Sequence, residues 1–333
     1  MTTLHERNEQ TPSLPAERWV EILSKEYLDS FVRDGGAAVK FAVTVEDGTR
    51  ELLRKRLKAE AKARGYLWAE IDSRKTKVHM LEQVFFAVAE QVPWLDLCEK
   101  RLLRMAKEAH FAPPAEGTGS LAGRIALAQP KGNDVSQIVQ ELRPLIGKAA
   151  LQRRDLARDF RTAMTELCRA VLISEPGEMA TSAAILSWLT GRDHRVSAVK
   201  PYSIYNSISR ANARFMLQSA VRWISESDHT GLVIWLDINR VPIPKPRGAP
   251  ADNPLYYSRA AVLDAYEVLR EFIDSIDDSM HQLLVVGTGQ EFVGSELGGR
   301  GMVSYSALQN RLVADVKIRN LANPMGTLVS VSS

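Results

Sequence analysis

The fold is decided by residues 39–72, VKFAVTVEDGTRELLRKRLKAEAKARGYLWAEID. Residues 39–45 carry apolar side chains at every odd position, which is the period of a half-buried β-strand. Residues 50–64 place leucine and alanine four positions apart, as on one helix face, and Gly65 follows where a helix C-cap prefers glycine. Residues 66–71 then predict a second strand. A strand–loop–helix–strand unit of about 35 residues is the size of a crossover between two parallel strands.

The remaining chain extends this pattern to a whole α/β protein. A five-residue apolar run at 232–236 is typical of a strand buried on both faces, and 283–286 predicts another. We therefore expect a P-loop NTPase-like (AAA+-like) parallel sheet flanked by helices, with a large helical insertion. The expected helices span residues 16–32, 204–224, 258–276 and 305–316, and residues 77–224 are almost entirely helical around a loop at 112–133.

These elements divide the chain into four parts. Residues 1–15 form a polar tail of mixed charge, and 16–76 form the first part of the α/β core. Residues 77–224 form a helical insertion or subdomain, and 225–333 complete the core. The tail does not have the pattern of a signal peptide, and no apolar run approaches the about 18 residues of a membrane span. We expect a cytoplasmic protein without membrane contact.

Composition excludes some classes of function. The chain has 333 residues, 45% of them hydrophobic, which allows a sizeable core. Its net charge of +3 permits contact with nucleic acid but does not indicate it, because a binding footprint is a clustered patch. Cys98 and Cys168 have no metal-ligand spacing, and the six histidines are scattered. We expect reduced, buried cysteines and no metal site.

Polar residues occupy three predicted strand ends. They are the loop at 44–50, Asp237, and the Gly-Thr-Gly of 287–289. Ligands of open parallel sheets bind beyond the carboxyl ends of the strands. A loop at a helix N-terminus, an acid on a second strand and a hydroxyl on a third form the layout of a P-loop NTPase. Alone, the two Gly-Thr segments are more often ordinary turns or helix caps, and Asp237 is equally often a turn starter. Only their combination favours a nucleotide site.

Four blocks of sequence resemble one family, the P-loop ATP-binding proteins of BREX-type phage-defence systems. The blocks are NARFML at 212–217, GLVIWLD at 231–237, GTGQEF at 287–292 and GMVSYSALQNRL at 301–312. In the family the third block tends to read Gly-Thr-Pro-Glu-Phe, and the fourth follows Gly-x-x-Ser-Tyr-x-Ala-Leu-x-x-Arg-Leu. The resemblance implies an AAA+-like ATPase that acts with partner proteins on DNA. It also implies that relatives continue into a further C-terminal domain.

The phosphate loop departs from that family. Relatives carry Gly-x-Gly-Lys-Thr, and alignment places Gly48 on the last glycine, Thr49 on the lysine and Arg50 on the threonine. Glu46 and Asp47 replace small residues, and each carboxylate would repel a phosphate by about 1–4 kcal/mol at ~4 Å. Because adjacent helical residues point about 100° apart, we expect Arg50 not to take the place of the missing lysine.

The acid on the third strand is also incomplete. The family's Asp-Glu pair becomes Asp237-Ile238, so the glutamate that would polarise the attacking water is absent. We expect a vestigial nucleotide site formed by Gly48, Thr49, Arg50, Asp237 and Thr288, with no catalytic residue and no bound ATP or magnesium.

Three functions remain open from the sequence. The first is a degenerate ATPase-like scaffold or regulatory subunit of a defence complex. The second is an active ATPase that acts on DNA with an unorthodox phosphate loop. The third is a DNA-binding subunit that needs no nucleotide, whose candidate contacts are Arg153, Arg154, Arg158 and Arg161, with a further basic stripe along the helix at 50–64. A charge run on a helix is more often a solvated face.

The expected partners follow from the first hypothesis, in which the protein keeps the ATPase fold but lacks the catalytic residues and therefore acts by binding. We expect other defence-system proteins as partners, with DNA and a second copy of the chain as further candidates. The helical block is the expected contact surface. Arg311 is the candidate residue for a subunit interface, and pairing within its own domain is the equal alternative.

Overall fold

The computed structural model describes residues 12–117, 119–129, 134–193, 195–248, 255–294, 299–313 and 322–333. These residues form one six-stranded sheet in the order β1-β6-β2-β5-β4-β3, with every neighbouring pair parallel. The predicted parallel α/β fold is therefore confirmed. The strands are β1 (Leu14–Pro15), β2 (Ala37–Thr44), β3 (Leu67–Asp72), β4 (Leu232–Asp237), β5 (Gln282–Gly289) and β6 (Leu328–Ser332).

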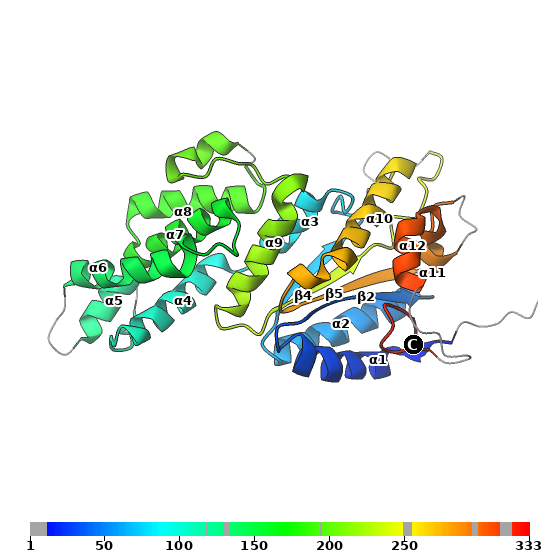
Figure 1. Ribbon diagram of the computed structural model, residues 1–333, viewed down its shortest axis with the longest axis horizontal. Helices are drawn as coiled ribbons and strands as arrows, with labels where there is room; N and C mark the ends of the chain where they lie inside the picture. Colours follow the sequence, from blue (N-terminus) through cyan, green and yellow to red (C-terminus); the bar gives the residue numbers. More distant parts are fainter. Residues whose placement is uncertain are drawn as a thin grey trace, which may run out of the picture.

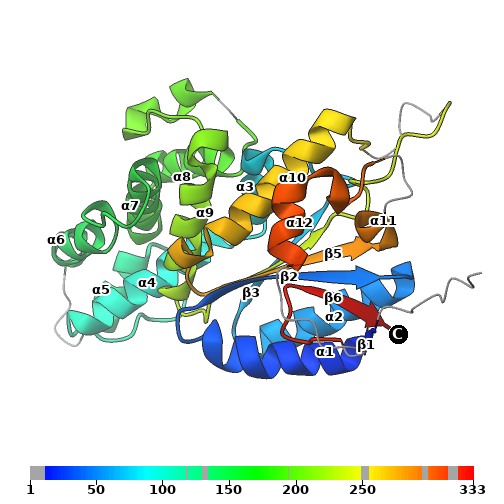
Figure 2. The same cartoon turned by 45° about the vertical axis from the view of Figure 1, so that its right-hand side comes forward.

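Helices cover both faces of the sheet (Figures 1 and 2). α1 and α2 lie below it, α10 and α12 lie above it, and α4 to α8 form a group beside it, joined through α9. The helices are α1 (Ala16–Leu23), α2 (Asp47–Ala63), α3 (Leu81–Ala89), α4 (Trp94–Glu108), α5 (Leu121–Ala128), α6 (Val135–Ile146), α7 (Arg158–Ile173), α8 (Pro176–Leu189), α9 (Arg210–Ser225), α10 (Arg259–Asp274), α11 (Gln290–Val293) and α12 (Ser306–Val313). A π-helical segment, Ser24–Phe31, continues α1.

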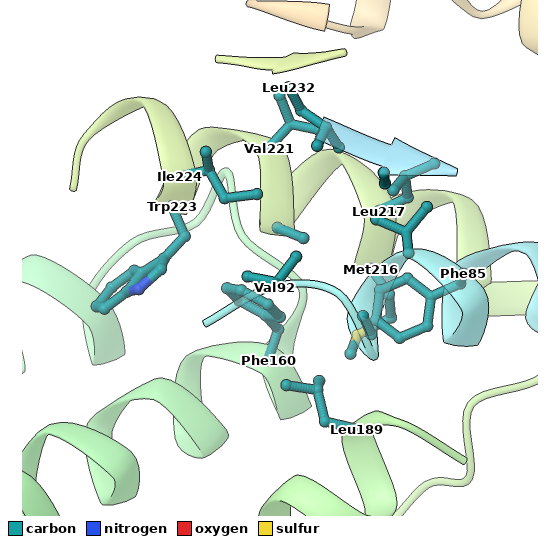
Figure 3. Packing of buried hydrophobic residues seen from close by; sticks show 14 of the residues in the cluster. Phe85, Val92, Phe160, Leu189, Met216, Leu217, Val221, Trp223, Ile224 and Leu232 are labelled. Atoms are coloured by element: carbon teal, nitrogen blue, oxygen red, sulfur yellow. The ribbon is translucent and has the colours of Figure 1, made fainter. Parts of the chain in front are cut away.

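The core consists of two apolar clusters, one on each face of the sheet. The smaller cluster lies between the lower face of the sheet and the helices α1 and α2. The larger one runs from the upper face through α3 and α9 into the helical group without a break. Figure 3 shows this continuity, where Leu217 and Val221 of α9 lie between Leu232 of β4 and Phe160 of α7. The division of the chain into separate domains stays a prediction.

β2 is buried on both faces, whereas its alternating sequence predicted a half-buried strand. The difference comes from Lys40, which is only 5% exposed. Its ammonium group donates hydrogen bonds to the carbonyls of Met325 at 2.6 Å and Gly326 at 3.2 Å, and lies over the ring of Tyr27. A polar residue is therefore buried in a central strand because the C-terminal segment supplies its acceptors.

Two further differences from the sequence concern strands. The Gly-Thr-Gly of 287–289 belongs to β5 and not to a turn after it, because parallel pairing continues to Thr44↔Gly289. The short strands β1 and β6, at one side of the sheet, were not predicted. The loop predicted at 112–133 contains a helix, α5. Residue 118 and residues 130–133 of this loop lie outside the described part.

The sheet has a topological switch point between β2 and β5. After β2 the chain crosses the lower face through α2, and after β5 it continues on the upper face, where Phe292 of α11 stacks on Phe41 at 5.9 Å. Because neighbouring strands lead to opposite faces, their carboxyl ends diverge into a crevice. Such a crevice is where doubly wound folds bind ligands.

Candidate functional site

Arg50 occupies the crevice at the strand ends. Its side chain is 10% exposed, and its Nε donates a hydrogen bond to Asp237 Oδ2 at 3.0 Å. Nη2 donates to Asp47 Oδ1 at 2.6 Å, and Nη1 lies 3.5 Å from Thr44 Oγ1. Helical side chains lean toward the N-terminus of their helix, which directs this one back to the strand ends. One guanidinium therefore binds two carboxylates and reaches a hydroxyl at the switch point.

The connection from β2 to α2 is shorter than a phosphate loop. β2 ends at Thr44 and α2 begins at Asp47, three residues before the predicted start, so two residues separate them. A G-x-x-x-x-G-K-[ST] loop places several residues between strand and helix, and their amides surround the phosphates. Gly48 and Thr49 instead lie in the first helical turn. A side chain added at Gly48 would meet no atom within 4 Å, so no close approach requires glycine there.

Asp237 is a largely buried acid at the end of β4. It ends β4 opposite Gly287 of β5 and Asp72 of β3, and it accepts a hydrogen bond from the Asn239 amide at 2.9 Å. Burial raises the pKa of Asp237 above its usual range, and Arg50 and the Asn239 amide offset only part of this rise. An acid whose pKa is raised by burial beside a fixed cation is typical of functional sites.

Neither the predicted member Thr288 nor Ile238, at the position of the missing glutamate, adds a side chain to this cluster. Ile238 is fully buried in the upper core, where the family has its glutamate. Thr288 shares the upper face with Val286, because strand side chains alternate, and its hydroxyl is buried with no hydrogen-bond partner among the described residues. Only its carbonyl touches the cluster, accepting a hydrogen bond from Thr44 at 3.3 Å.

The sequence interpretation missed two polar side chains, Asn239 and Glu291. Asn239 Oδ1 and Glu291 Oε2 both lie within 2.5 Å of the point where a side chain on Gly289 would begin. A side chain at Gly289 would therefore have to displace the flexible ends of these two groups. Their positions in the sequence could have identified them, because each residue lies two places beyond the end of a central strand.

Two cavities open at this edge of the sheet. The smaller, of about 160 Å³, is lined by Arg50, Asp237 and Asn239 together with Arg74 and Arg240. The larger, of about 740 Å³, extends past the outer edge of β3, and its walls are mostly charged. Paired ions leave little apolar surface, which distinguishes it from a typical small-molecule pocket. Among the described residues, no group of three or more His, Cys, Asp or Glu side chains could hold a metal ion.

Three of the four predicted DNA contacts on the helical group have partners within the described part of the chain. Arg153 binds Glu226 at 2.8 Å, and its terminal nitrogen pairs with Asp155. Arg158 lies over the Tyr205 ring. Arg161 donates a hydrogen bond to the carbonyl of residue 151, whereas Arg154 is exposed.

Arg311 also has a partner within the chain. Its Nε donates to Asp274 of α10 at 2.9 Å, and 47% of its side chain is exposed. The interface role of Arg311 stays a prediction, as do the DNA contacts.

Comparison with known proteins identifies the family. A family model described as BREX system ATP-binding protein BrxC/D matches residues 126–333, which is more than half of the chain. The chain belongs to this family. The four blocks that carried the resemblance all lie within the matched region of the BrxC/D family, whereas β2, α2 and Arg50 precede it. No curated protein and no solved structure matches.

Membership of the BrxC/D family makes the chain a component of a BREX phage-defence system. Across the part of the chain that the structure describes, no helix is both long and apolar enough to cross a membrane.

Proposed function

We propose that this chain is a subunit of a BREX phage-defence complex that acts as a scaffold or regulator without hydrolysing ATP. The observation that carries the proposal is the position of Arg50. In P-loop enzymes a threonine of the phosphate loop and an aspartate on a neighbouring strand hold the magnesium ion. Here Arg50 stands at the threonine position and binds that aspartate, Asp237, directly. The protein supplies its own cation where a nucleotide complex would bring one.

The residues around Arg50 do not fit a magnesium nucleotide. The two-residue connection provides no amide cradle, Thr49 provides no ammonium group, and Asp47 places a carboxylate at the helix N-terminus. A metal ion at Asp237 would have to displace a hydrogen-bonded guanidinium. We therefore derive no catalytic step through ATP.

One observation favours the rival function, an active ATPase. Glu291 places a carboxylate above Gly289 at the switch point, and a carboxylate could orient an attacking water in place of the missing glutamate. This rival requires both Glu291 and Asp237, which makes it testable by the same assay.

Steady-state ATP turnover tests the proposal. We expect the wild-type protein with ATP and magnesium to release phosphate no faster than a protein-free blank. Asp237→Ala and Glu291→Gln serve as controls for contaminating ATPases, which neither change would affect. Turnover that both substitutions abolish would establish the rival.

The remaining functional assignments are also proposals. A non-hydrolysing family member acts by binding, so we propose contacts with other BREX proteins through the helical group of α4 to α8. Light scattering after size-exclusion chromatography checks self-association, with Arg311→Ala as the interface variant. We propose a cytoplasmic location, because a phage-defence complex acts where the infecting DNA enters.

A further inference from the structure

Two neighbouring loops at the carboxyl edge of the sheet carry five cations. One follows β3 and carries Lys75 and Lys77, and the other follows the adjacent strand β4 and carries Arg240, Lys245 and Arg247. Residues 239–248 contain no acid at all. We call these five residues the basic rim.

The loops that carry the rim are tied to each other. The Ser73 amide donates to the Asp237 carbonyl at 2.9 Å, and the Arg240 amide lies 3.3 Å from the Ser73 hydroxyl. The Tyr257 hydroxyl is hydrogen-bonded to the carbonyls of Ser73 at 2.9 Å and Thr76 at 2.7 Å. The rim is therefore anchored to both strands and to the segment before α10.

The rim cations differ from the basic stripe on α2. None of the five forms an ion pair within the part of the chain that the structure describes. The stripe on α2 is, by contrast, largely neutralised, because Arg54 and Lys58 bind Glu70 and Arg64 binds Asp29. The charge of the rim remains available to an external anion.

The loop after β4 is also stiff. Pro242, Pro244 and Pro246 alternate with other residues, and each proline fixes its own φ. Lys245 and Arg247 are both exposed and flank the last of these prolines. A restrained loop loses less conformational entropy when it binds a partner.

An aromatic side chain lies within the rim. The Arg240 guanidinium stacks on the Tyr256 ring at 4.5 Å from its centroid. None of the large apolar side chains that are exposed among the described residues lies at 72–77, 239–248 or 255–258. Protein interfaces usually have an apolar centre, whereas nucleic-acid sites combine cations with aromatic rings.

We propose that the basic rim binds a nucleic-acid strand through its backbone phosphates. Contacts of this kind fix position and carry no sequence preference. The proposal does not depend on the absence of ATP hydrolysis, because Lys245 and Arg247, which the test below changes, line neither cavity beside Arg50. It also differs from the contacts on the helical group, most of which have internal partners.

Fluorescence anisotropy with a labelled single strand of about 20 nucleotides tests the proposal. We compare the wild type with Lys245→Glu/Arg247→Glu and with a matched control, Arg143→Glu/Lys148→Glu, which makes the same charge change on exposed residues of the helical group that are not candidate DNA contacts. Thermal unfolding of each variant checks that it folds.

We expect the rim variant to bind at least about tenfold more weakly at ~0.1 M salt, with a salt dependence reduced by about two contacts, and the control to stay within about twofold. Equal loss in the control would overturn the proposal, as would absence of wild-type binding at low salt. Competition by polyglutamate as strong as by unlabelled oligonucleotide would assign the rim to an acidic protein and also overturn it.

Discussion

Two partly buried charge networks in this protein are built in opposite ways. At the sheet edge one cation, Arg50, is held by two carboxylates. At the end of α9 one carboxylate, Glu226, is held by two cations, with Arg101 at 2.7 Å and Arg153 at 2.8 Å. Arg101 also lies over the Trp223 ring at 4.2 Å. The second network fastens α4 and the segment before α7 to α9.

The two acids respond to burial differently. Burial works to raise the pKa of Glu226, but hydrogen bonds from Arg153 and Arg101 outweigh it and hold the pKa below the ordinary 4.5. Burial raises the pKa of Asp237 above the ordinary 3.8 even though Arg50 is bound. Ionised Glu226 stabilises the fold, whereas ionised Asp237 destabilises it. We infer a structural role for Glu226, and the raised pKa of Asp237 supports the proposal that it belongs to a vestigial nucleotide site.

Among substitutions in the two networks, the largest change in stability is expected at Glu226. Removing one partner of a fully buried ion pair costs about 3–5 kcal/mol. Because 36% of the Glu226 side chain is exposed, solvent screens part of this, and we expect Glu226→Gln to lower the free energy of unfolding by about 2 kcal/mol. Urea denaturation measures it, with the exposed Glu17→Gln as a control expected within about 0.5 kcal/mol. A loss no larger than the control's would remove the structural role.

A smaller effect of opposite sign is expected at Asp237. Because its folded-state pKa is raised, the folded protein binds this proton more tightly than the unfolded chain, and stability is lost as pH rises through the folded pKa. Asp237→Asn removes that loss while Asp47 still pairs with Arg50. We expect the variant to be more stable than wild type at pH 7, by up to about 1 kcal/mol, and equal to it below about pH 3.8.

Urea denaturation across this pH range checks the Asp237 prediction, with the exposed Asp34→Asn as the matched control. Glu226→Gln should show the reverse trend, approaching wild-type stability as pH falls below about 4.5. A clear destabilisation by Asp237→Asn at pH 7 would contradict the distinction between the two networks.

The sequence predicted the sheet well where hydrophobic patterns are strong. The apolar runs of β4 and β5 are buried on both faces, and the crossover through α2 was expected from its period and from Gly65. The sequence could not show that Lys40 is buried, because its acceptors at 325 and 326 are distant in the chain.

The sequence shows which residue types the candidate site lacks, but it does not show how the remaining side chains contact one another. Loss of the lysine and glutamate is visible at Thr49 and Ile238. The role of Arg50 was not visible, because it depends on where α2 begins and on a contact with Asp237 across 187 positions. Asn239 and Glu291 escaped notice since only the close approach to Gly289 brings them together.

Calorimetric titration of the wild-type protein with ATP in the presence of magnesium tests the central claim most directly. With Arg50 bound to Asp237 and no amide cradle, we expect no saturable binding up to about 1 mM ATP, which limits any binding free energy to about −4 kcal/mol. Binding of about 1 μM affinity, near −8 kcal/mol, that disappears in Asp237→Ala would contradict the claim that the protein fills this site with its own cation.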